Sequence, residues 1–479
     1  MVEHLTLNQG VQGSSPWWCT KALILQSSCG VGAFLVIRAF NFMDNKLLTG
    51  PIRRTLLQFA VPIMCSMLAG QLYTVADSVI IGRFLDAQAL AAVSNGSTIM
   101  MVFLFISGGM ELGCGLLVAA KQPVYNKEEM SRLLYNLLFL DAVIAVLMML
   151  IGFPTFTLWL KLIRTPEEIL QGAAVYGRIY LLFLLFQMVY DVSRELMIGM
   201  GDSASPMLLM IATSLLNVAL DILLVPVWGL AGAALATGLA QLLGCMIILF
   251  LLSRKYLLTP FSLSLLTVEY GRDILRLAPP NAIQQASGMV ITMVKQSLLG
   301  GLGAMAIAGF SCANKVTTLM MMPVYGFTQA LVIFIAQNES AGQEQRIRRA
   351  VKDARGITML YITLVVACCI CGAGLLIGLF TEDKEAICYG ALMLTWEPAA
   401  NYFYGLRLMN EAQLRGRQRM GRYMVSSIGA IAVNMVSCLL LVPRVGYQGF
   451  YISSYISTVS SLLASVVLTR GMGPRQGTT

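Results

Sequence analysis

Charged residues are scarce in this chain, since Asp, Glu, Lys and Arg make up 12% of its 479 residues, against about 25% in soluble globular proteins. Histidine occurs once, as His4, and Cys368, Cys369 and Cys371 cluster on one apolar run with no histidine nearby. The scarcity of charge excludes an ordinary soluble domain, and the single histidine excludes a histidine proton relay inside a membrane. Without a histidine nearby, the three cysteines are interpreted as small core residues rather than a metal site. We expect no metal centre and no cofactor.

The chain is instead rich in long apolar stretches. Apolar residues account for 57% of the chain and the mean hydropathy is +0.74. A bilayer-spanning helix needs roughly 20 such residues, and uninterrupted runs indicate helices rather than alternating barrel strands. The sequence therefore predicts an all-α polytopic membrane protein with twelve spans. These lie near residues 55–80, 88–119, 132–156, 169–200, 205–226, 230–252, 274–300, 305–337, 355–380, 386–414, 423–443 and 447–469.

The chain repeats itself at an offset of 217 residues, without net insertion or deletion. Leu223-Leu224-Val225-Pro226 recurs as Leu440-Leu441-Val442-Pro443, and Asn217 pairs with Asn434. Each copy holds six predicted spans, and an even number gives both copies the same orientation. Two similar halves in a membrane are the usual construction of a secondary transporter.

The formal net charge of +9 is unevenly distributed between the predicted loops. Most Lys and Arg fall on the side where the first span begins, which is typical of cytoplasmic loops. We therefore expect a multi-pass cell-membrane protein with both ends of its membrane domain in the cytoplasm, and no nucleic-acid partner. The opposite loops carry only Arg83, Lys161, Arg164, Lys384 and Arg444.

The repeat also predicts the domain boundaries. Residues 1–42 have no second copy, and we expect them to be a gene-start artefact preceding Met43, or else a disordered leader. The expected parts that follow are an N-terminal lobe at 43–252, a cytoplasmic linker at 253–273, a C-terminal lobe at 274–470 and a cytoplasmic tail at 471–479.

Ionisable residues within spans are costly, so each is a functional candidate. Asn217 and Asp221 are four residues apart and share a helix face, while Asp77 and Thr237 lie at similar depth near the external side. A partly dehydrated carboxylate can hold a proton near neutral pH, or a small cation such as Na⁺. The alternative is a polar network that only fastens helices. Because Asp77 and Asp221 align with Val294 and Cys438, the acids belong to the first lobe alone.

Other polar or helix-bending residues leave more than one interpretation open. Pro62 either sets a static kink in the first span or is a hinge that opens a cavity. Arg194 with Glu195, and Arg407 with Glu411, are expected to form structural ion pairs. Lys295 either pairs with an acid or extends outward, and Glu397 precedes a proline that breaks the tenth span.

Five segments resemble the multidrug and toxic compound extrusion (MATE) family of antiporters: Phe59 to Pro62, Leu72 to Phe84, Ala89 to Ser94, Gly199 to Pro206 and Leu414 to Gly416. The resemblance implies two six-helix bundles forming a V in a bacterial inner or plasma membrane. It implies export of organic, mostly cationic drugs or toxic compounds in exchange for H⁺ or Na⁺. The implied coupling positions are Asp77, Asn217, Asp221 and Thr237.

The chain departs from the family pattern at three positions. The seventh span offers Gln284 or Gln285 and the tenth offers Tyr404, where one branch of the family carries acids. The fourth span offers Arg194 or Glu195 in place of an asparagine. Glu195, Gln284 and Tyr404 are therefore secondary polar candidates. We expect the chain to act as a monomer in contact with the lipid bilayer.

Two rival functions remain at this stage. A flippase for a lipid-linked oligosaccharide would share the two-lobed plan, although it should carry more cations in mid-span to bind pyrophosphate. An intramembrane enzyme is disfavoured because the spans hold no His, no metal-ligand cluster and no Gly-x-Ser-x-Gly turn.

Overall fold

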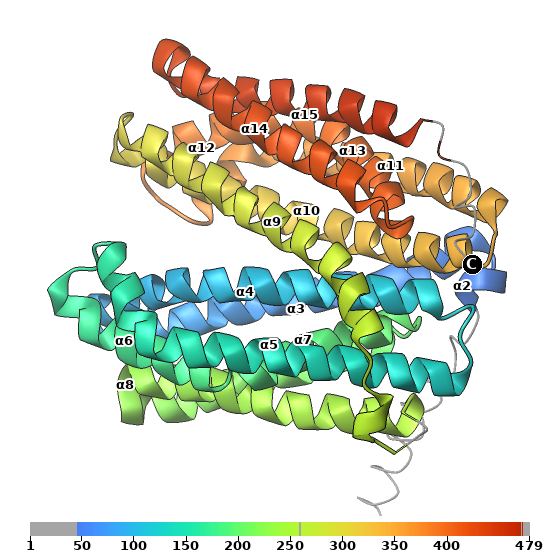
Figure 1. Cartoon of the computed structure of the whole chain (residues 1–479). Coiled ribbons are helices and arrows are strands. Elements are labelled where there is room, and N and C mark those ends of the chain that lie inside the picture. The colour runs from blue at the N-terminus through green and yellow to red at the C-terminus, as the bar shows by residue number, and fades with distance from the viewer. Residues whose placement is uncertain (1–45, 258–259, 471, 473–479) are drawn as a thin grey trace, which may run out of the picture. The chain divides into compact units, whose positions relative to one another are not determined.

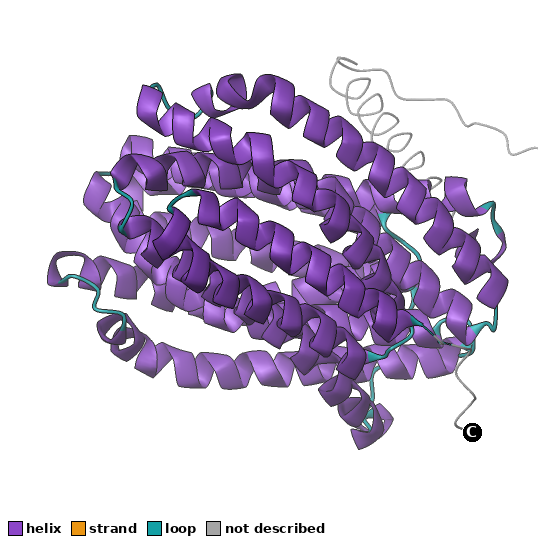
Figure 2. Ribbon diagram, turned by 90° about the horizontal axis from the view of Figure 1, so that it is seen from above, coloured by secondary structure: helices purple, strands orange, loops and turns teal. Residues whose placement is uncertain are grey.

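The computed structural model describes residues 46–257, 260–470 and 472, and every regular element in this part of the chain is helical (Figures 1 and 2). The extension predicted at 1–42 and nearly all of the tail at 471–479 lie outside the described residues. Long apolar runs form these helices because a helix satisfies all its backbone hydrogen bonds internally. The predicted all-α class is confirmed.

The first bundle is built from the helices that precede residue 256. A short helix, α2 (Lys46–Thr49), leads into them. Asp86 begins α4 by accepting a hydrogen bond from the Ala89 amide at 2.7 Å, and Asn126 begins α5 through a capping box with Glu129. The long helices are α3 (Ile52–Phe84), α4 (Ala87–Lys121), α5 (Lys127–Leu162), α6 (Glu167–Leu182), α7 (Leu184–Gly199) and α8 (Ala204–Lys255).

The second bundle repeats this order. A short connection containing η1 (Leu263–Leu265) joins it to the first. The linker predicted at 253–273 is shorter as a non-helical segment, because helices extend to Lys255 and resume at Val268. The elements are α9 (Val268–Gly300), α10 (Ala304–Ser340), α11 (Glu344–Gly378), α12 (Lys384–Trp396), η2 (Glu397–Ala400), α13 (Asn401–Gly416), α14 (Met420–Val445) and α15 (Gln448–Thr469).

Twelve spans are compatible with these helices. Among the described helices, eight are individually long and apolar enough to cross a membrane, and the α6–α7 pair, bent by 52°, makes a ninth. The 52-residue α8 contains two predicted spans. Uncharged polar residues such as Asn281, Gln284 and Gln285 lower the hydropathy of α9, and the break at η2 leaves α12 and α13 with only 13 and 16 residues, so these helices do not pass the same test.

Two glycines make equivalent turns in the two bundles. Gly229 (φ 56°, ψ −133°) reverses α8, and Gly446 (φ 67°, ψ −144°) separates α14 from α15. Positive φ of this kind is accessible to glycine and strained for other residues. The offset of 217 residues relates the two positions, so the repeat extends from the sequence to the backbone.

Close helix contacts join the bundles. A Cβ on Gly109 would lie 2.6 Å from the Cβ of Ala282, and one on Gly113 would lie 3.0 Å from the backbone nitrogen of Ala278. The small residues of α4 therefore let α9 approach, as in the Gly-x-x-x-Gly contacts of membrane helices. Gly326 of α10 meets α3 in the same way. The bundles thus contact each other where α4 ends and α9 begins.

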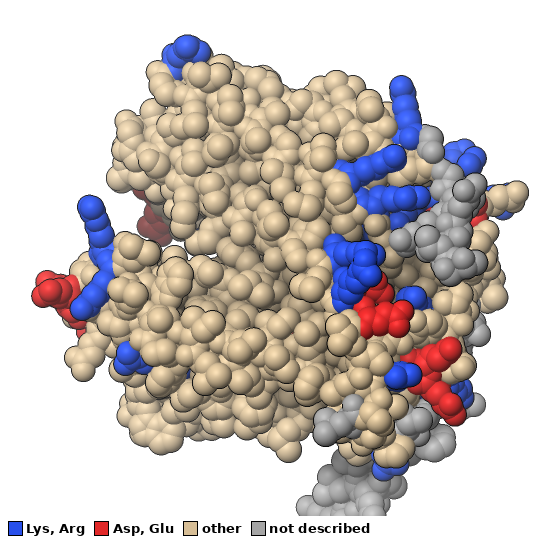
Figure 3. All heavy atoms as spheres, viewed as in Figure 1, with Lys and Arg blue, Asp and Glu red and all other residues tan. Residues whose placement is uncertain are grey.

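The charged residues on the surface are distributed unevenly between the two ends of the molecule. Figure 3 shows a broad belt without charge, with most of the visible Lys and Arg at the end where α2 and the C-terminus lie. The same view shows a hollow between the bundles toward the other end. The bundles are therefore joined at the basic end and separated at the opposite end.

Candidate functional site

The structure brings the four predicted coupling residues together in the first bundle. Asp77 lies on α3, and Asn217 and Asp221 share a face on the first arm of α8. The turn at Gly229 returns the second arm, so that Asn217 Nδ2 donates a hydrogen bond to Thr237 Oγ1 at 3.4 Å. Asp77 and Asp221 lie within range of each other's charge. The predicted grouping of these residues is therefore present in the fold.

Oxygen atoms in this group lack donors. Asp221 is fully buried, and neither of its carboxylate oxygens accepts a hydrogen bond from any described residue. Asn217 Oδ1 and one oxygen of Asp77 are also buried and accept no hydrogen bond from any described residue. Buried polar atoms are nearly always satisfied, and a buried carboxylate needs a proton or a cation to offset its charge. Two carboxylates, an amide and a hydroxyl suit either H⁺ or a hard monovalent cation.

Three tyrosines complete the walls of this site, and the sequence analysis missed them. Tyr73 lies one helical turn before Asp77, and its side chain lies near Thr237. Tyr176 and Tyr180 of α6 pack with ring centroids 6.2 Å apart, and both lie within range of the Asp77 charge. Spacing could have indicated Tyr73, because it precedes Asp77 by four residues on the same helix, but it does not relate Tyr176 or Tyr180 of α6 to Asp77.

A second group of ionisable residues lies deeper in the first bundle. Arg194 of α7 pairs with Glu111 of α4, and the prediction that Arg194 and Glu195 form a local ion pair is wrong. Adjacent helix residues point in directions about 100° apart, so they do not face each other. Asp141 of α5 is fully buried without a hydrogen-bond partner among the described residues. The predicted pair of Arg407 and Glu411 is confirmed at 2.8 Å.

Glu195 instead belongs to the contact between bundles. Its carboxylate accepts a hydrogen bond from Gln329 Nε2 of α10, and Arg415 Nη2 contacts Gln329 Oε1 at 3.3 Å. One turn further along α7, the Gly199 carbonyl accepts a hydrogen bond from Gln337 Nε2 at 2.9 Å. This secondary candidate therefore lies in a polar junction between α7 and α10.

The remaining candidates occupy three different environments. Pro62 lies within α3, which runs as one helix from Ile52 to Phe84, and the Pro62 carbonyl accepts a hydrogen bond from Ser66 Oγ at 3.1 Å. Gln284 is half-buried, while its neighbour Gln285 packs against Gly108 of α4. Tyr404 lines a polar cavity in the second bundle. The structure does not bring these residues to the site around Asp221.

Comparison with known proteins identifies the family to which this chain belongs. The MatE family model matches residues 62–223 and again residues 280–440, which are one segment in each copy of the repeat. The chain belongs to the MatE family. A MatE chain with these helices is a multi-pass membrane transporter of the multidrug-efflux type and not an enzyme. The family expectation drawn from the sequence is thereby confirmed.

The similarity between this chain and individual relatives extends over most of each protein's length. The chain is 26% identical over 82% of its length to a probable multidrug resistance protein, YpnP of Bacillus subtilis, covering 87% of that protein. It is 23% identical over 88% of its length to an FAD transporter of Shewanella oneidensis, covering 93% of that protein. An outward-facing MATE transporter structure matches with a TM-score of 0.83 at 21% identity, covering 89% of this chain and 97% of that one. The last likeness concerns the fold.

Proposed function

We propose that this MatE transporter exports organic, mostly cationic drugs or toxic compounds in exchange for H⁺ or Na⁺ bound at Asp77 and Asp221. The burial of the Asp221 carboxylate, with no donor to either oxygen in the described chain and a second acid nearby, carries the proposal. Asn217 and Thr237 supply further oxygen ligands. A cation at this site relieves the repulsion between the carboxylates and the cost of burying them.

The exchange gains its energy from inward movement of the coupling ion. One monovalent cation that moves through a potential of 100 mV supplies about 2.3 kcal/mol. A bound cation and a bound cationic substrate compete for the same negative site in the first bundle. Entry of the ion therefore favours release of the substrate, which is the basis of antiport.

Alternating access follows from the contact between the bundles. The basic end, which the positive-inside rule assigns to the cytoplasm, is joined through Glu195 and Gln329, and the other end is hollow. The proposed transport cycle breaks this junction and closes the outer end. Pro62 lies in α3 between the junction and Asp77, where a missing backbone hydrogen bond lowers the cost of bending.

The surroundings of the proposed transporter follow from its composition. The uncharged belt supports a location in the inner or plasma membrane of a bacterium, and we propose that both ends of the membrane domain are cytoplasmic. Its 29 methionines supply soft, adaptable contacts for varied substrates. A single copy contains both bundles and the whole coupling site, so the proposed working unit is a monomer.

Ethidium transport by purified protein in liposomes tests the coupling site. The variants are Asp77→Asn and Asp221→Asn, and Asp273→Asn is the matched control because Asp273 lies outside the site. We expect the wild type and the control to transport ethidium in an imposed H⁺ or Na⁺ gradient, and the two site variants to lose gradient-driven transport. Normal transport by both site variants contradicts the coupling proposal. Wild-type protein that moves no ethidium in either gradient favours a lipid-linked flippase instead.

A further inference from the structure

A polar cavity lies inside the second bundle, away from the site around Asp221. Its volume is about 370 Å³, and its walls come from α9, α10, η2, α13, α14 and α15. Three charged side chains line it: Lys295, Glu397 and Arg407. A cavity of this size with both signs of charge can hold a small organic molecule.

The repeat relates this cavity to the site around Asp221 and shows how their charges differ. The offset of 217 residues places Asn434 and Ser454 at the positions of Asn217 and Thr237, and both line the cavity. The two acids have no counterpart in the second bundle. Instead, Lys295 aligns with Ser78 and Glu397 aligns with Tyr180. The second site thus has one base and one acid in place of two acids.

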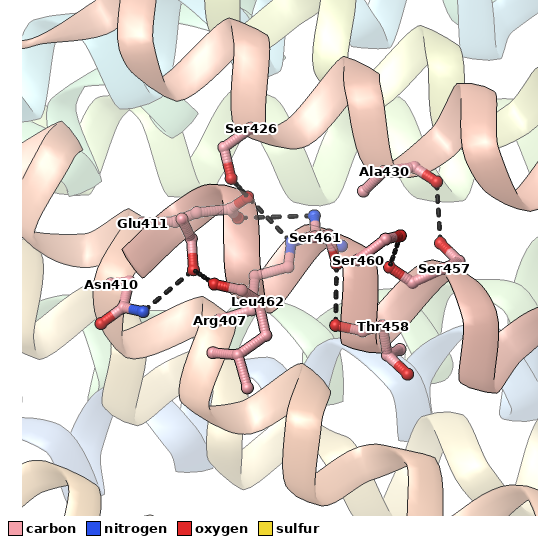
Figure 4. A network of polar contacts seen from close by, with 11 residues as sticks. Arg407, Asn410, Glu411, Ser426, Ala430, Ser457, Thr458, Ser460, Ser461 and Leu462 are labelled. Carbon is pink, nitrogen blue, oxygen red and sulfur yellow. Dashed lines mark hydrogen bonds and ion pairs between the residues drawn. The ribbon is translucent and has the colours of Figure 1, made fainter. Parts of the chain in front are cut away.

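The charge of Arg407 is matched within the protein. Its Nε donates to Glu411 Oε1 at 2.8 Å, and the same carboxylate oxygen accepts a hydrogen bond from Ser426 Oγ at 2.8 Å. Figure 4 shows this group, in which the Arg407 and Glu411 side chains face each other between neighbouring helices. Arg407 therefore forms a fixed part of the wall and leaves little unmatched charge for a ligand.

Lys295 and Glu397 are different because they face the same cavity without forming an ion pair. In the described part of the chain, the Lys295 ammonium has no carboxylate partner at ion-pair distance. Glu397 accepts a hydrogen bond from Ser454 Oγ at 3.1 Å and lies within range of the Lys295 charge. One positive and one negative group are thus left separated across the cavity.

Further lining groups suit an organic molecule rather than an ion alone. The rings of Tyr325 and Tyr404 pack at 87° with centroids 6.3 Å apart and provide an apolar surface. Asn401 Nδ2 is buried and donates to no group among the described residues. A ligand oxygen satisfies this donor, since buried amide groups are normally hydrogen-bonded.

We propose that this cavity binds organic zwitterions, with Lys295 holding the anionic group and Glu397 the cationic group. A simple cation is repelled by Lys295 and a simple anion by Glu397, whereas a molecule with both charges satisfies both residues. The proposal rests on the proposed export function in one respect, namely that the occupant is a transported substrate. It adds amphoteric compounds to the cations expected at the first site.

Binding to purified protein in detergent tests the cavity with three matched fluorescent probes. Nε-dansyl-lysine carries an α-ammonium and an α-carboxylate, its methyl ester keeps only the ammonium, and its Nα-acetyl derivative keeps only the carboxylate. The variants are Lys295→Met and Glu397→Gln. The matched control is Lys315→Met, because Lys315 lies exposed in the same bundle and does not line the cavity.

We expect wild-type protein and the control to bind the zwitterion about tenfold tighter than either derivative, since loss of one charge partner costs at least this much. Lys295→Met loses the preference over the ester, and Glu397→Gln loses the preference over the acetyl derivative. These opposite losses cannot come from general misfolding, which weakens all three probes alike. Equal wild-type affinity for the three probes overturns the proposal.

The two proposals fail separately. If wild-type protein transports ethidium in an ion gradient but shows no preference for the zwitterion, only the cavity assignment is wrong. If it transports nothing but shows the preference with both variant effects, the binding site stands and the antiport function is wrong.

Discussion

The carboxylate of Glu195 on α7 accepts a hydrogen bond from the side-chain amide of Gln329 on α10, and this buried polar contact helps to join the two bundles. Both residues are buried. Glu195 also packs against Gly115 of α4, where a Cβ would lie 2.4 Å from the Glu195 Cγ. Residues of α4, α7 and α10 therefore all contribute to this contact. Its loss should change how often the bundles separate at this end more than it changes either bundle.

Replacing Gln329 by Ala should shift the protein toward the arrangement that opens at the basic end. The change leaves the buried Glu195 carboxylate without its donor, at a cost of about 1–3 kcal/mol. Spin labels are attached at positions 127 and 352 in a cysteine-depleted background, in place of Lys127 and Lys352. The distance distribution between them, measured by double electron–electron resonance, should shift to longer distances or broaden. Gln345→Ala, at an exposed position on α11, is the control. An unchanged distance distribution in Gln329→Ala contradicts the assigned role of this junction.

Replacing Gly229 by Ala should destabilise the first bundle because Gly229 has a φ of 56°. A left-handed conformation costs a residue with a Cβ about 1–2 kcal/mol. No atom lies closer than 3.9 Å to the added Cβ, so conformation rather than a clash causes the effect. The melting temperature should fall. Gly288→Ala is the control: Gly288 lies inside α9 with open space around it, and alanine there should be neutral or stabilising. Equal melting temperatures for the two variants contradict the prediction.

The sequence predicted the parts of this fold that depend on local pattern. Hydropathy placed the spans, and the positions of Asn217 and Thr237 within their spans predicted a similar depth, in agreement with their contact at 3.4 Å. Spacing alone put Asn217 and Asp221 on one helix face. These results follow because helix geometry relates residues three or four apart.

Contacts between distant helices were not predictable in the same way. Arg194 pairs with Glu111, which lies 83 residues away along the chain, and the neighbouring Glu195 contacts the other bundle. A helix face can be read from spacing, but the helix that packs against it depends on the tertiary arrangement. Tyr176 and Tyr180 were missed for this reason, since nothing local connects α6 with Asp77.

Replacing Thr237 by Val should weaken both stability and ion coupling. Valine keeps the shape of threonine but removes the oxygen that accepts from Asn217 Nδ2, and an unsatisfied buried donor costs about 1–3 kcal/mol. The melting temperature should fall, and ethidium transport should need a steeper ion gradient. Thr74→Val is the control, because the exposed Thr74 hydroxyl only donates to the Gly70 carbonyl of its own helix. If Thr237→Val transports ethidium with the wild-type gradient dependence, Thr237 is not a coupling ligand.

Breaking the pair of Arg194 and Glu111 should be the most destabilising of these changes. Both side chains are largely buried, and removing one partner of a buried pair costs about 3–5 kcal/mol because the other charge stays unmatched. We expect Arg194→Met and Glu111→Gln each to lower the melting temperature strongly, and the double variant to be more stable than the sum of the single effects implies.

The pair of Arg348 and Glu344 supplies the matched control for this cycle. Its atoms are 3.0 Å apart, but the Arg348 side chain is 73% exposed. Arg348→Met and Glu344→Gln should therefore show a coupling energy below about 1 kcal/mol. The melting temperatures of the single and double variants of each pair give the two coupling energies to be compared. A coupling energy for the buried pair as small as that of the exposed pair would mean that Arg194 finds another partner in the first bundle. Asp191 is the nearest candidate, because it also lies within range of the Arg194 charge.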